Sequence, residues 1–171
     1  MDNPNNDLWN LARKHSDQVR WKTISGYSNL SPEFITEFGD NLDWDRLCRS
    51  QRLTAEHYEK YYDYIDWTLV SRYQPLTIDL LRYHEHSVYW GHISRRVGLP
   101  ASILREFKHR LYWPDVSASL NLNLDIIEEF KDYLDWQCVS KNECITEEVI
   151  EKYSDKIIWD DLRYATIIKK S

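Results

Sequence analysis

The sequence predicts an all-α fold, a short right-handed α-solenoid of seven helical-hairpin repeats that are each 23 residues long. Glycine (4) and proline (5) are scarce among the 171 residues, which argues against a turn-rich all-β protein. Apolar residues recur with helical spacing, as at Phe34, Phe38 and Leu42. The strongest observation is a tryptophan at every 23rd position, without insertion or deletion. The series is Trp21, Trp44, Trp67, Trp90, Trp113, Trp136 and Trp159.

The period predicts a single repeat domain over residues 1–171. A divergent N-terminal capping repeat spans 7–29, five core repeats span 30–144, and a C-terminal capping repeat spans 145–171. One hairpin cannot bury its apolar stripe alone, so neighbouring repeats must supply the other wall of the core.

Each repeat is expected to contain a first helix of about ten residues and a second of about six, because 23 residues accommodate both with a turn. Polar or proline residues mark the start of the first helix. These residues are Ser31, Thr54, Thr77, Pro100, Asn123 and Thr146. Asp43, Asp66 and Asp135 directly precede a tryptophan of the series and are predicted N-caps of the second helix.

The seven tryptophans are predicted to be structural core residues that hold one hairpin to the next. An aliphatic residue follows each of the last six by three positions, such as Leu47 after Trp44, which suits a buried helix face. A second recurring position carries Phe38, Tyr61 and their equivalents and is also expected in the core. The alternative is an exposed surface on which bases stack.

The pattern L-[ST]-x-[ED]-h-h-x-[EK]-[FY]-x-D-x-h-D-W resembles the uncharacterised short (23-residue) tandem-repeat proteins of large double-stranded DNA viruses, such as the mimivirus-like viruses. Residues 30–52, 53–75 and 122–144 match it best. Residues 76–98 and 99–121 depart from it, with Tyr89 and Tyr112 where aspartate is expected. The resemblance implies a viral origin and a helical repeat, and it carries no activity or site.

Composition favours a soluble, intracellular, non-enzymatic protein without a cofactor. The net charge is −6, no apolar run approaches the roughly 18 residues that span a bilayer, and three cysteines lack metal-like spacing. No catalytic or phosphate-binding motif is present. His84, His86, His92 and His109 cluster in two repeats, but no acid or cysteine is placed to complete a metal site, so none is predicted.

Charge is uneven along the chain. Residues 76–121 hold six basic and four acidic side chains, whereas residues 122–167 hold five basic and twelve acidic ones. Arginine and tyrosine often anchor interfaces, so the basic middle is a predicted partner surface, although a solvated basic face would show the same pattern. The predicted partner-binding residues are Arg82, Tyr89, Arg95, Arg96, Arg105, Lys108 and Tyr112.

These observations favour a protein–protein interaction or scaffold module, with another protein as its partner. One alternative is a helical repeat that binds nucleic acid through the basic middle, which the net charge of −6 disfavours. Another is an acidic decoy of a host factor. No membrane contact is expected, and the exposed end of a stacked array is compatible with self-association.

Overall fold

In the computed structural model, residues 4–27, 29–119 and 124–162 are described, and throughout these ranges the chain is helical, without strands. The all-α prediction is confirmed. The chain divides into two compact units, 1–88 and 89–171, where the sequence predicted one repeat domain. The count of seven repeats, the handedness and the single domain stay predictions. No helix in the described ranges is long and apolar enough to cross a membrane.

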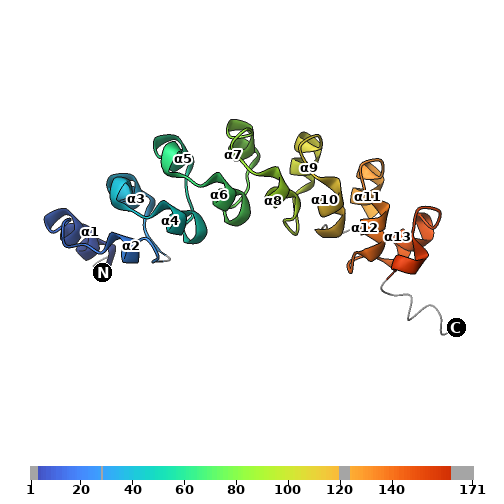
Figure 1. Cartoon of the computed structure of the whole chain (residues 1–171), viewed down its shortest axis with the longest axis horizontal. Helices are drawn as coiled ribbons and strands as arrows, with labels where there is room; N and C mark the ends of the chain where they lie inside the picture. The colour runs from blue at the N-terminus through green and yellow to red at the C-terminus, as the bar shows by residue number, and fades with distance from the viewer. Residues whose placement is uncertain (1–3, 28, 120–123, 163–171) are drawn as a thin grey trace. The chain divides into compact units, whose positions relative to one another are not determined.

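Unit 1 is built from hairpins whose first helices lie in one layer and whose second helices lie in the other (Figure 1). The first layer contains α1 (Pro4–Lys14), α3 (Pro32–Phe38), α5 (Ala55–Lys60) and α7 (Ile78–Tyr83). The second contains α2 (Trp21–Ile24), α4 (Trp44–Ser50) and α6 (Trp67–Tyr73), and α4 packs on α6. The short 3₁₀ turns η1 (Gly39–Asn41) and η2 (Tyr62–Tyr64) lead from the first helix to the second.

Unit 2 repeats this arrangement. Its first helices are α9 (Ala101–Phe107), α11 (Leu124–Phe130) and α13 (Glu147–Lys152). Its second helices are α8 (Trp90–Ser94), α10 (Trp113–Ser119) and α12 (Trp136–Lys141), followed by the 3₁₀ turn η3 (Trp159–Asp161). The helices α8, α10 and α12 pack in series.

The predicted helix starts are found where the structure describes them. Ser31 accepts a hydrogen bond from the N–H of Phe34 at 3.2 Å, and Asp43 accepts one from the N–H of Arg46 at 3.1 Å. Asn123 lies outside the described residues. First helices are six or seven residues long after residue 30, not ten. They end early because the chain leaves helical geometry at the second aromatic position, as at Tyr61 (φ −115°, ψ 28°).

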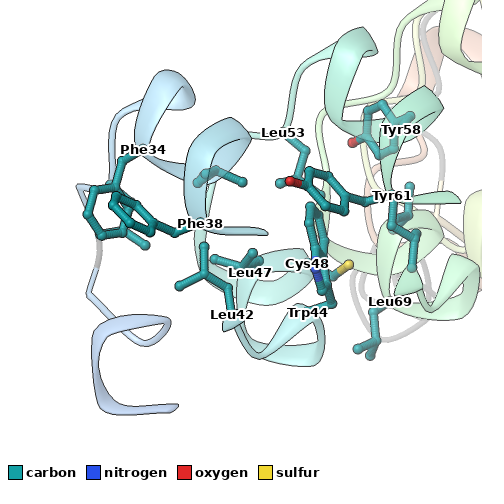
Figure 2. Close-up of a cluster of buried hydrophobic side chains, with 14 of the residues drawn as sticks. Phe34, Phe38, Leu42, Trp44, Leu47, Cys48, Leu53, Tyr58, Tyr61 and Leu69 are labelled. Atoms are coloured by element: carbon teal, nitrogen blue, oxygen red, sulfur yellow. The ribbon is translucent and has the colours of Figure 1, made fainter. Parts of the chain in front are cut away.

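This early turn aims the second aromatic side chain at the tryptophan of the preceding repeat. Ring centroids in these pairs are 4.3–5.5 Å apart and the planes are tilted by 33–39°, an arrangement that favours aromatic contact. Figure 2 shows one pair, Trp44 and Tyr61, in the core of unit 1. The pairs are Trp21–Phe38, Trp44–Tyr61, Trp67–His84, Trp90–Phe107, Trp113–Phe130 and Trp136–Tyr153.

The tryptophans differ in burial, which corrects the expectation that Trp159 is a core residue. Trp44 is 4 % exposed, whereas Trp159 is 50 % exposed and does not lie in the core. Among the described residues, no ring of a following repeat covers Trp159, and this explains its exposure. The remaining five are half-buried: Trp21, Trp67, Trp90, Trp113 and Trp136.

A buried serine links successive second helices. Ser117 Oγ donates to the carbonyl of Trp113 at 2.7 Å and accepts the N–H of Asp135, in the next repeat, at 3.0 Å. The side chain thereby satisfies polar groups on two helices at once, which a buried backbone N–H requires. Equivalent bridges are made by Ser25, Ser94 and Ser140.

Candidate functional site

The predicted basic surface is divided between the two units. Arg82 lies on α7 in unit 1, where it pairs with Asp79 at 3.5 Å. The other six residues lie in unit 2, so neither unit holds the whole predicted set. These six are Tyr89, Arg95, Arg96, Arg105, Lys108 and Tyr112.

Within unit 2, two of the predicted arginines are neutralised on different helix layers. Arg95, at the end of α8, pairs with Asp115 of α10 at 2.8 Å. Arg105, on α9, makes a bidentate contact with Glu129 of α11 at 2.5 and 2.7 Å. These exposed pairs add little stability, but they reduce the positive potential that would attract an anionic partner.

The remaining predicted residues have different surroundings. Lys108 Nζ lies 5.6 Å from the ring centroid of Tyr133. Burial lowers the pKa of Arg96. Tyr89 and Tyr112 are 55 % and 58 % exposed. Two of the predicted arginines are thus paired with carboxylates of neighbouring hairpins, and the partner surface stays a prediction.

A groove lies instead in unit 1, between the first helices α5 and α7. It has a volume of about 580 Å³. Its walls carry Tyr83, which is 83 % exposed, and the exposed charged residues Arg52 and Glu59. The lining residues are Arg52, Leu53, Ala55, Tyr58, Glu59, Pro75, Thr77, Asp79, Leu80, Tyr83 and His84.

The groove borders a four-ring aromatic cluster. His84 stacks on Trp67 with centroids 4.3 Å apart, and Tyr62 lies 5.4 Å from Trp67 and 6.1 Å from His84. Tyr58 closes the group at 5.7 Å from Trp67 and 5.8 Å from His84. Since both Tyr58 and His84 line the groove, the cluster gives it an aromatic floor held by two consecutive hairpins.

Burial disfavours the charged forms of His84 and Tyr58 in this floor. Burial lowers the pKa of His84, against an opposing effect of Glu59. Burial raises the pKa of Tyr58, whose hydroxyl donates to Gln74 Oε1 at 3.3 Å. Neutral rings suit contact with apolar or cationic side chains, because a positively charged floor would repel the latter.

Trp67 also differs from the tryptophans of other repeats at its indole nitrogen. In the repeats of Trp21, Trp44, Trp113, Trp136 and Trp159, Nε1 donates to the carbonyl five residues earlier at 2.9–3.3 Å. Trp67 Nε1 is buried without a hydrogen-bond partner among the described residues. An unpaired buried donor costs about 1–3 kcal/mol, so the aromatic cluster sits at a locally destabilised point of the scaffold.

A second groove, of about 500 Å³, adjoins the first between α3 and α5. Glu33 and Glu56 line it, and Ala55 lines both grooves. Glu33, Glu56 and Glu59 make no hydrogen bond or ion pair with any described residue. Glu37 lines the same groove but, by contrast, binds Arg13 through two contacts of 2.6 and 2.7 Å, and this lowers the pKa of Glu37.

The structure shows the surroundings of two kinds of potentially reactive side chain, the buried Cys48 thiol and the histidines of the central repeats. Burial raises the pKa of the Cys48 thiol to about 12, so the thiol stays protonated and is a poor nucleophile. In the described part of the chain, no group of three or more His, Cys, Asp or Glu residues is arranged to hold a metal ion. His92 instead packs on Tyr89 at 4.8 Å, and His109 faces Tyr133 at 6.4 Å.

The groove residues can be recognised in the sequence as departures from the repeat. Tyr58 occupies a position that is aliphatic in the other repeats, as at Ile35 and Leu81. His84 occupies the position that is otherwise Phe or Tyr from Phe38 onward. The distribution of charged residues along the sequence identifies neither Tyr58 nor His84. In comparisons with known proteins, no family model, curated protein or solved structure matches the chain.

Proposed function

We propose that this chain is a helical-repeat protein-binding module that holds an extended basic segment of a partner protein across α3, α5 and α7. The observation that carries the proposal is the pair of adjoining grooves with an aromatic floor and three carboxylates that have no ion-pair partner among the described residues. The viral origin suggested by the repeat motif, the nucleic-acid alternative and the acidic decoy stay predictions.

The acidic charge of the first-helix layer in unit 1 favours a basic partner. The first-helix segments 30–42, 53–65 and 76–88, together with Arg52 of the groove wall, hold eight acidic and three basic side chains, a net charge of −5. Such a layer attracts cationic segments and disfavours nucleic acid. The Glu59 carboxylate and the Tyr58 and Tyr83 rings can together receive a guanidinium or ammonium group, through Coulomb attraction and contact with the ring faces.

The repeat spacing sets the spacing of the basic side chains. Packed helices lie roughly 8–10 Å apart, and an extended chain rises about 3.3 Å per residue. About three residues of an extended partner therefore span one repeat. A segment with a basic side chain at every third position would place one cation in each groove.

The test uses a fluorescein-labelled peptide of about twelve residues with arginine at every third position, a length that spans about four repeats. Fluorescence anisotropy measures its binding to the full chain and to a variant carrying Glu33→Gln, Glu56→Gln and Glu59→Gln. Rim charges contribute roughly 0.2–1 kcal/mol each, so the variant is expected to bind about tenfold more weakly.

The matched control carries Glu147→Gln, Glu148→Gln and Glu151→Gln on α13, which changes the net charge equally at exposed positions. Its affinity should stay within about twofold of the parent chain, because only long-range charge is altered. Equal weakening in both variants would show non-specific attraction and overturn the proposal. Equally tight binding of a peptide with glutamate in place of arginine would overturn it as well.

A further inference from the structure

The second-helix layer of unit 1 presents two arginines around one tyrosine. Arg49 lies in the last turn of α4, and Arg72 and Tyr73 end α6. The Cζ atom of each arginine lies 5.4 Å from the Tyr73 ring centroid, so the two Cζ atoms are at most twice that distance apart. Arg49 Nη1 also donates to the Tyr73 hydroxyl at 3.5 Å. The ring thereby orients two guanidinium groups from different repeats.

The same repeat position is neutralised in unit 2. A cation stands five residues after the tryptophan at Arg49, Arg72, Arg95 and Lys141. Arg95 and Lys141 each pair with an aspartate two residues after the next tryptophan, Asp115 at 2.8 Å and Asp161 at 3.4 Å.

In unit 1 this neutralising aspartate is missing. The position two residues after the next tryptophan carries Leu69 in the repeat that follows Arg49 and His92 in the repeat that follows Arg72, so neither repeat supplies an aspartate there. Arg49 and Arg72 make no ion pair with any described residue. The second-helix segments 20–29, 43–51 and 66–75 hold five basic and three acidic side chains, a net charge of +2, within a chain of net charge −6.

We infer that Arg49, Arg72 and Tyr73 form a binding site for a diphosphate-type anion, on the layer opposite the acidic grooves and independent of the proposed function. Guanidinium groups bind phosphate through paired, charge-assisted hydrogen bonds, and their planar geometry favours phosphate over chloride. Two guanidiniums held within twice 5.4 Å of each other by one ring can together contact two linked phosphates. Contact with Arg already occupies the exposed Tyr73 ring, so a base-stacking surface for a nucleic-acid strand is disfavoured.

The test titrates the full chain with inorganic pyrophosphate at constant ionic strength and follows the arginine Nε–H resonances by NMR. Orthophosphate serves as the one-phosphate comparison. We expect saturable binding of pyrophosphate that is at least about tenfold tighter than that of orthophosphate. Arg49→Gln and Arg72→Gln should each weaken pyrophosphate binding about tenfold, since each removes one bidentate contact.

Arg95→Gln is the matched control, because it removes an equivalent cation that Asp115 already neutralises. It should leave pyrophosphate binding unchanged. All three arginines are exposed, so the variants should keep the far-UV circular dichroism of the parent chain. Equal weakening by Arg95→Gln, absence of saturable binding, or tighter binding of a single-stranded oligonucleotide than of pyrophosphate would each overturn the inference.

Discussion

Gln74→Glu replaces one NH₂ group by oxygen at a fully enclosed site between two repeats. The Gln74 side chain is 1 % exposed. Its Nε2 donates to the carbonyls of Cys48 and Gln51, each at 2.7 Å. Its Oε1 accepts from the N–H of Leu53 at 3.1 Å and from the Tyr58 hydroxyl at 3.3 Å. The amide is therefore both donor and acceptor, and a carboxylate of the same shape can only accept.

The expected loss of stability follows from the two carbonyls. A buried polar group left without its partner costs about 1–3 kcal/mol, so two orphaned carbonyls that face a new oxygen cost about 3–5 kcal/mol at neutral pH. The carboxylate retains the bonds from Leu53 and Tyr58, which limits the loss. Against a total stability of about 5–15 kcal/mol, the variant would be marginal.

The loss should depend on pH. Burial and the two carbonyls disfavour the charged form, so the folded-state pKa of the introduced carboxyl lies above its unfolded value of about 4.3. The folded variant then binds more protons than the unfolded chain, and its stability falls as pH rises through the folded-state pKa. Below about pH 4 the carboxyl is neutral in both states and can donate one hydrogen bond, so the difference from the parent chain is smallest there.

Urea unfolding followed by tryptophan fluorescence, at a series of pH values from 4 to 8, measures this difference against the parent chain. Gln18→Glu makes the same chemical change at an exposed position whose side chain has no hydrogen bond to a described residue, and it should shift stability by less than about 0.5 kcal/mol. A Gln74→Glu variant whose deficit is below about 1 kcal/mol, or is the same at every pH, would refute the role of the amide as a donor between repeats.

Two further perturbations test the packing between repeats. Gly39→Ala would place a methyl group against the ring of the buried Tyr61, so we expect a loss of about 2–3 kcal/mol by urea unfolding. Gly91→Ala in α8 would meet the exposed side chain of Tyr89, which can move aside, and should be neutral or stabilising; a similar effect of the two would contradict the close approach at residue 39. Ser117→Ala removes the bridge to Asp135 and should cost about 1–3 kcal/mol, and the serine-bridge interpretation fails if thermal unfolding of this variant matches that of the parent chain.

Local rules account for the parts of the fold that recur. The 23-residue period, the polar residues before each helix and the helical spacing of apolar residues all depend on neighbours in sequence. The N-caps at Thr54, Asp66 and Asp135 could therefore be predicted, and the structure confirms them. Helix length could not, because the early end at Tyr61 serves a ring contact with Trp44, one repeat away.

The candidate sites could not be predicted from local sequence patterns, because they depend on contacts between residues of different repeats. Arg105 and Arg95 look like free cations in the sequence, yet Glu129 and Asp115 neutralise them from neighbouring hairpins. Arg49 has the same repeat position as Arg95 but lies beside Tyr73 without a carboxylate partner in the described chain. The sequence alone determined an all-helical chain and its repeated packing positions, because those follow from backbone and side-chain preferences over a few residues. Only the tertiary structure decided which charges are left unpaired and where the grooves lie, since both depend on side chains brought together from different repeats.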